Sequence, residues 1–123
     1  MQQRALIAVV DDDVSSRESL PDLLRTLGFA AMPFASAEDF LASDVLADIQ
    51  CLILDVSMPG MSGPQLQSEL NRRELKIPII FTTGHCDREL RVDLLARGAV
   101  ECLFKPFSEQ DLRSALDCVF GTA

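Results

Sequence analysis

The sequence predicts an α/β domain in which five strands alternate with five helices in a (βα)5 pattern. Short apolar runs such as residues 6–10 and 51–54 lack polar alternation, as expected for strands covered on both faces. Segments with leucines at helical spacing follow these runs, and strands that alternate with helices form a parallel sheet. The chain has 123 residues, the size of one domain, so we expect residues 1–123 to form a single unit.

The first strand, residues 6–10, leads into a helix whose apolar face comprises Leu20, Leu23, Leu24 and Leu27. Ser15 and Glu18 have the spacing of a capping box at its start, and Gly28 stands where a C-terminal cap is expected. Pro21 lies inside this helix. It predicts a kink or a later start, because proline removes one backbone hydrogen bond.

The second and third strands are expected at residues 29–34 and 51–54. Pro33 lies near the end of the second strand, which predicts an edge position because proline is best tolerated there. Ser36 is expected to cap a short helix after it. Pro64, shortly after the third strand, predicts the start of the next helix, because proline is favoured in a first turn.

The last two strands are expected at residues 79–82 and 99–104. Asp87 is expected to cap the helix between them. Ser108, with Asp111 three residues later, has the spacing of a cap for the last helix. The residues of this helix that we expect to face the core are Leu112, Leu116, Val119 and Phe120.

Polar side chains stand at the ends of four strands: Asp11, Asp12, Asp55, Thr82, Thr83 and Lys105. The carboxyl ends of parallel strands lie at one edge of a sheet, where open α/β folds bind their ligands. In the doubly wound, flavodoxin-like strand order 2-1-3-4-5, a crevice opens between strands 1 and 3. Asp11, Asp12 and Asp55 are therefore expected to converge in that crevice.

Three neighbouring carboxylates repel one another, and a hard cation with oxygen ligands relieves the repulsion. Mg²⁺ suits such a site and is commonly shared with phosphate groups. Lys105 can act as a point charge on a phosphoryl group, and the hydroxyl of Thr83 can donate a hydrogen bond to it. Asp55 is the expected nucleophile, because carboxylates form aspartyl-phosphate intermediates.

The composition excludes several classes of protein. A net charge of −8 argues against nucleic-acid binding by this chain itself. No apolar run is long enough to span a membrane, and a cytoplasmic location is expected. Cys51, Cys86, Cys102 and Cys118 form no CxxC pair, so we interpret them mainly as buried free thiols. A zinc site at His85 and Cys86 lacks the usual ligand spacing.

Four motifs resemble the receiver domain of bacterial two-component response regulators, the CheY-like family. They are the acidic pair at residues 11–12, the segment 55–63 that begins with Asp55, the Thr83-Gly84 pair, and residues 105–107, Lys-Pro-Phe. The resemblance covers the whole chain, and the residues around the motifs are most similar to those of FixJ-type receivers. Such receivers commonly precede a LuxR-type DNA-binding domain.

The resemblance implies that Asp55 accepts a phosphoryl group from a sensor histidine kinase. It implies Mg²⁺ ligation by Asp12, Asp55 and the backbone carbonyl of Ser57, with Asp11 acting mainly through water. Thr83 and Lys105 would contact the bound phosphoryl group, and the bond before Pro106 would be cis. Such a domain hydrolyses its own acyl phosphate slowly, and is a switch more than an enzyme.

Two departures from the family qualify these expectations. Cys102 occupies the position three residues before Lys105 where the family usually has an aromatic residue, and a small thiol cannot fill the same space. The chain also ends at Ala123, soon after the last expected helix, so any output domain for transcription regulation is absent from it. We expect phosphorylation to act through the fourth helix, fifth strand and fifth helix, with dimerisation as one outcome.

Three other functions fit these residues less well. A pseudo-receiver would bind proteins without taking phosphate, but it would not need the complete set of acidic, hydroxyl and lysine residues. Hydrolases of the haloacid-dehalogenase type place an acid two residues after the nucleophile, where this chain has Ser57. A flavodoxin-like FMN carrier is disfavoured because three aspartates in its first loop would repel a phosphate.

Overall fold

The computed structural model describes residues 4–84 and 87–121 and contains one parallel sheet. Its strand order is β2-β1-β3-β4-β5, as the sequence predicts. The strands are β1 (Leu6–Val10), β2 (Ala30–Phe34), β3 (Cys51–Asp55), β4 (Ile79–Thr83) and β5 (Glu101–Phe104). β2 lies at one edge, which confirms the position inferred from Pro33. His85 and Cys86, the zinc ligands considered above, lie outside the described residues.

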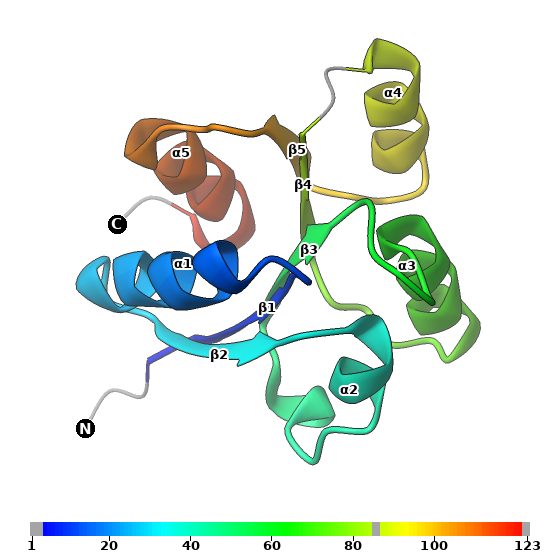
Figure 1. Ribbon diagram of the computed structural model, residues 1–123, viewed down its shortest axis with the longest axis horizontal. Helices are drawn as coiled ribbons and strands as arrows, with labels where there is room; N and C mark the ends of the chain where they lie inside the picture. Colours follow the sequence, from blue (N-terminus) through cyan, green and yellow to red (C-terminus); the bar gives the residue numbers. More distant parts are fainter. Residues whose placement is uncertain (1–3, 85–86, 122–123) are drawn as a thin grey trace.

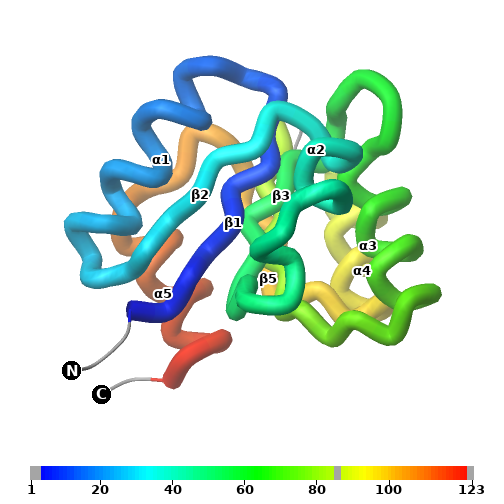
Figure 2. The backbone as a smooth tube through the Cα atoms, turned by 90° about the horizontal axis from the view of Figure 1, so that it is seen from below, coloured from blue at the N-terminus to red at the C-terminus, as the bar shows by residue number. Residues whose placement is uncertain are grey.

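Helices cover both faces of the sheet, as Figure 1 shows. α1 (Val14–Thr26) and α5 (Glu109–Phe120) lie on one face, and α2 (Ala37–Leu41), α3 (Gly63–Arg72) and α4 (Arg88–Ala96) lie on the other. The view in Figure 2 shows the same separation on either side of β2, β1 and β3. A 3-10 turn, Leu46–Asp48, precedes β3.

Alternate residues along the strands contribute side chains to two separate apolar cores, one on each face of the sheet. Ile7, Val9 and Ile53 pack with side chains of α1 and α5. Ala8 and Leu54 belong to the second core, whose helical members include Phe40, Leu66, Leu70 and Leu94. Because β3 is buried along its entire length, the side chain at its end is held between two packed layers.

Helix α1 begins earlier than the sequence suggests. Its N-cap is Asp13, whose carboxylate accepts a hydrogen bond from the backbone N–H of Ser15 at 3.2 Å. The predicted capping box at Ser15 and Glu18 is therefore wrong, because an aspartate two residues upstream already caps the helix. Pro21 lies inside the helix and does not delay its start. The remaining predicted caps, Ser36, Asp87 and Ser108, are confirmed.

Two apolar residues of α5 are less buried than the sequence suggests. Cys118 is exposed, whereas Cys51 and Cys102 are buried free thiols as expected. Phe120 is 38% exposed and packs its ring against Phe29 with a centroid separation of 5.2 Å. None of the helices within residues 4–84 and 87–121 is long and apolar enough to cross a membrane.

Candidate functional site

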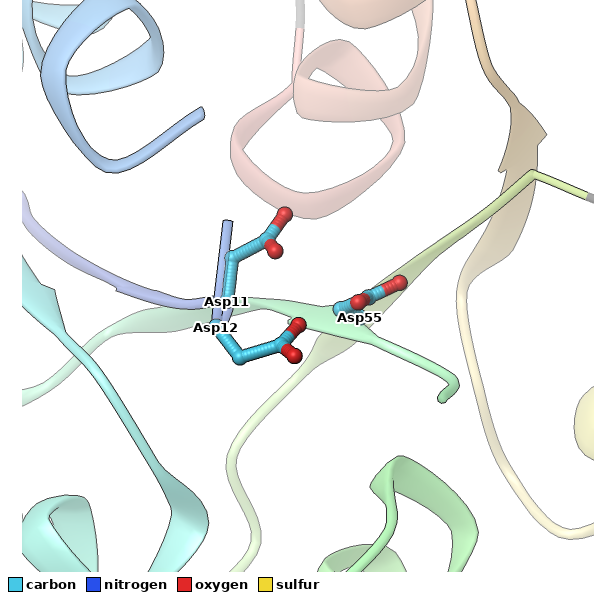
Figure 3. Close-up of side chains that lie close together, drawn as sticks. All are labelled: Asp11, Asp12 and Asp55. Atoms are coloured by element: carbon cyan, nitrogen blue, oxygen red, sulfur yellow. The ribbon is translucent and has the colours of Figure 1, made fainter. Parts of the chain in front are cut away.

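Three carboxylates gather at the carboxyl ends of β1 and β3 (Figure 3). One oxygen from each of Asp11, Asp12 and Asp55 lies within 4.8 Å of the others. Asp11 and Asp55 are buried, and Asp12 is exposed. The predicted convergence of these side chains is therefore observed, and Asp12 leaves the cluster open to solvent.

Backbone hydrogen bonds hold Asp11 in place. Its N–H donates to the carbonyl of Phe34 at the end of β2, at 3.2 Å. One carboxylate oxygen accepts from the backbone N–H of Asp13 at 2.9 Å, and the Asp11 carbonyl accepts from the guanidinium of Arg17 at 3.1 Å. Sequence reasoning missed Arg17, because a charged residue in a first helical turn carries no distinctive signal.

Lys105 reaches the cluster from the end of β5. Its ammonium nitrogen lies 2.9 Å from Asp11 Oδ2 and 3.7 Å from Asp55 Oδ1. Burial alone would lower the pKa of Lys105, but the hydrogen bond to Asp11 and the charge of Asp55 raise it overall. The lysine therefore stays charged. The bond between Lys105 and Pro106 is cis, as the resemblance implies.

The cluster carries excess negative charge in spite of Lys105. Burial and the neighbouring charge of Asp11 raise the pKa of Asp55 to about 6, while Lys105 lowers it and Asp12 raises it. A nearby cation stabilises the charged form of a carboxylate whose ionisation is disfavoured in this way. Three carboxylates whose oxygens lie within one small sphere are a donor set of the kind that hard divalent ions prefer. The residues therefore fit a cation such as Mg²⁺.

Of the two remaining predicted site residues, Thr83 is buried and Ser57 is exposed. Thr83 is the last residue of β4 and is 3% exposed, and its carbonyl accepts a 2.7 Å hydrogen bond from the N–H of Lys105. Ser57 is exposed in the turn after β3, two residues beyond Asp55. Its backbone carbonyl as a metal ligand remains a prediction.

Gly63, the first residue of α3, also shapes the site. A Cβ atom there would overlap the carbonyl oxygen of Asp55 and would lie 3.0 Å from the Cα of Val56 and 3.1 Å from a ring carbon of Phe81. The absence of a side chain lets α3 begin directly against the end of β3. Only a glycine allows this approach.

A cavity of about 350 Å³ adjoins the cluster on the side of α1 and α5. Its walls include Leu20 and Leu23 of α1, together with Pro106 and Phe107 after β5. Asp11, Thr82 and Lys105 form part of its polar lining. The acidic cluster is therefore reached both through exposed Asp12 and from this cavity.

A buried aspartate lies at a strand end, with two further acids and a lysine beside it. This is the arrangement expected of a receiver domain from the motif resemblance. The family model for the response regulator receiver domain matches residues 7–117. The chain belongs to that family, which confirms the resemblance drawn from the motifs.

Individual relatives carry the comparison further. The chain is similar to Nodulation protein W of Bradyrhizobium diazoefficiens, with 44% identity over 113 residues, 92% of this chain and 50% of that protein. It is 39% identical to the Transcriptional regulatory protein FixJ of Azorhizobium caulinodans over 121 residues, 98% of this chain and 57% of that one. The crystal structure of FixJ-N superposes with a TM-score of 0.84 and 35% identity, covering 96% of this chain and 94% of that structure.

These comparisons confirm a receiver domain of the FixJ type, and they confirm the fold. The chain spans about half the length of the curated relatives it matches. The relatives include proteins named as transcriptional regulators. Members of this family are generally switches.

Proposed function

We propose that this domain is a Mg²⁺-dependent phosphoacceptor switch in which Asp55 receives a phosphoryl group. The observation that carries the proposal is the position of Asp55, buried at the end of β3 with Asp11, Asp12 and Lys105 around it. In the transfer, an Asp55 oxygen forms a new bond to phosphorus as the bond to the donor's leaving atom breaks. With a phosphohistidine donor, the leaving imidazole nitrogen keeps the electron pair and takes a proton.

Each residue has a distinct task in this proposal. Asp11, Asp12, Asp55 and the carbonyl of Ser57 would hold Mg²⁺, which supplies positive charge to the transferring phosphoryl group. Lys105 lies 3.7 Å from Asp55 Oδ1 and would pair with a phosphoryl oxygen as a second positive charge. The hydroxyl of Thr83 would donate a hydrogen bond to the same phosphoryl group. Slow hydrolysis of the acyl phosphate by water would reset the switch.

The partners follow from the reaction and from the relatives. The donor would be a sensor histidine kinase in the cytoplasm. The output would be transcription regulation through a LuxR-type DNA-binding domain, supported by relatives that are named transcriptional regulators and are about twice as long as this chain. The receiver itself would not bind DNA, because its net charge is −8.

The relay to the output would pass through α4, β5 and α5, with dimerisation of that face as one result. Cys102, at the usual aromatic position, is 3% exposed in the core beneath α2, α3 and α4. Beside it, Arg91 of α4 pairs with Glu101 of β5 at 2.7 Å, and the same Glu101 oxygen accepts from the N–H of Cys102 at 2.9 Å. These contacts would couple α4 to β5 in place of an aromatic ring.

Incubation with acetyl phosphate, followed by intact-protein mass spectrometry, tests the proposal. Wild type should gain one phosphoryl adduct with Mg²⁺ and none with a chelator, and Asp55→Asn should gain none. If wild type gains no adduct with Mg²⁺, even with phosphoramidate as donor, the domain is a pseudo-receiver that binds proteins without phosphate.

A further inference from the structure

The segment that follows Asp55, residues 56–62, is held at both of its ends. The N–H of Val56 donates to the carbonyl of Thr82 at 2.9 Å, and the N–H of Gly63 donates to the carbonyl of Val56 at 3.0 Å. Between these points the chain leaves the sheet and exposes Ser57, Pro59 and Gly60. We call residues 56–62 the acceptor loop.

A side chain from a distant part of the sequence meets the exposed part of this loop. The Oε2 atom of Glu38, in the first turn of α2, accepts a hydrogen bond from the backbone N–H of Met61 at 3.1 Å. Gly60 has a φ of 74°, and a Cβ atom there would lie only 2.7 Å from the same oxygen. The carboxylate therefore lies close against the backbone at Gly60 and Met61.

Helix α2, which carries Glu38, is anchored by its N-cap and by buried side chains. Ser36 caps the helix by accepting from the N–H of Asp39 at 3.0 Å. Ala37 and Phe40, on either side of Glu38, are fully buried in the core. An acceptor on an anchored helix restricts the loop more than one on a mobile segment, because less conformational entropy is lost on forming the bond.

We propose that Glu38 is a positioning residue that holds the acceptor loop in the geometry needed for metal binding. This inference rests on the proposed function, in which the loop supplies the Ser57 carbonyl as a Mg²⁺ ligand. Glu38 acts through the loop backbone and contacts neither the metal nor the phosphoryl group. Met61 packs against the core as a second anchor, so losing Glu38 should loosen the loop and leave the fold intact.

Three variants separate the hydrogen bond from the charge. Glu38→Ala removes both, Glu38→Gln keeps an acceptor oxygen, and Asp39→Ala removes one negative charge from the next exposed position. For each, Mg²⁺ affinity is measured by calorimetry, the Mg²⁺ dependence of phosphorylation by acetyl phosphate is followed, and amide exchange at Met61 is recorded by NMR.

Glu38→Ala should weaken Mg²⁺ binding about two- to tenfold, the range expected for one hydrogen bond. Its Met61 amide should exchange faster, and its phosphorylation rate at saturating Mg²⁺ should stay within about twofold of wild type. Glu38→Gln and Asp39→Ala should both remain near wild type. A merely structural role would lower the melting temperature without shifting half-saturation by Mg²⁺.

Unchanged Mg²⁺ affinity in Glu38→Ala would overturn the proposal, as would an equal loss in Asp39→Ala, which would assign the effect to charge alone. Unchanged exchange at Met61 would also overturn it. If wild type binds Mg²⁺ but takes no phosphoryl group, the proposed function fails while calorimetry and amide exchange still decide the role of Glu38. If wild type binds no Mg²⁺, both proposals fail.

Discussion

The backbone N–H of Lys105 donates a 2.7 Å hydrogen bond to the carbonyl of Thr83, which joins the ends of β5 and β4. The two residues proposed to contact the phosphoryl group are thus fixed to each other. β5 also carries Cys102 and Glu101, so this link connects the acidic cluster to the face that contacts α4.

Lys105→Ala is expected to leave the domain folded but to blunt its response to phosphorylation. Removing the lysine leaves the buried carboxylate of Asp11 without its cation, which should cost about 2 kcal/mol in the metal-free protein. Phosphorylation-dependent NMR shifts in α4 and β5 should shrink relative to wild type. Lys76→Ala, at the other lysine, which is exposed, is the matched control. Shifts of full size in Lys105→Ala would show that the lysine is dispensable.

Asp12→Asn is expected to stabilise the metal-free domain while weakening Mg²⁺ binding. Asp12 adds negative charge beside Asp55, and removing it should gain about 1 kcal/mol, or a few degrees in Tm. Thermal unfolding with a chelator and with Mg²⁺ measures both effects. Asp44→Asn, at an exposed carboxylate after α2, should change neither. A variant that binds Mg²⁺ as tightly as wild type would remove Asp12 from the ligand set.

Gly63→Ala is expected to destabilise the domain by about 1–3 kcal/mol, because its Cβ would overlap the carbonyl of Asp55. Urea unfolding measures the loss. Gly84→Ala is the control, since a Cβ there has no atom within 4 Å. Equal stability of the two variants would mean that β3 and α3 can separate without cost.

Thiol reactivity should differ sharply between Cys51 and Cys118. Burial raises the pKa of Cys51 to about 12, so its reactive thiolate is scarce at neutral pH, whereas Cys118 is exposed. Alkylation at pH 8 followed by peptide mapping should label Cys118 and spare Cys51 until urea is added. Between about pH 9 and 12 the unfolded chain loses the Cys51 proton that the folded chain retains, so stability falls as pH rises there. Rapid native labelling of Cys51 would contradict its burial.

Local patterns predicted the strands, most helix caps and the convergence of Asp11, Asp12 and Asp55. That convergence followed from chain direction alone, because parallel strands end at the same edge. The start of α1 was missed because Asp13 and Ser15 are both good caps, and only the packed structure selects one. Exposure of Cys118 was missed because apolar residues in a final helix do not all face the sheet.

Individual long-range hydrogen bonds and packing contacts, unlike the convergence of strand ends, were beyond sequence reasoning. Glu38 lies 23 residues from Met61, and an exposed glutamate in a short helix has no pattern that points to a distant backbone amide. The overlap at Gly63 depends on how closely α3 approaches β3, which is a property of the packing. The replacement at Cys102 was visible in the sequence, but the ion pair between Arg91 and Glu101 beside it emerged only from the structure.

Locating the phosphoryl group within the chain tests the account most directly. After phosphorylation with acetyl phosphate and Mg²⁺, borohydride reduction of the acyl phosphate and peptide mass spectrometry identify the modified residue. The account predicts modification of Asp55 alone, abolished by a chelator and by Asp55→Asn. Modification at Asp11, Asp12 or a residue outside the cluster, or full labelling of Asp55→Asn, would contradict it.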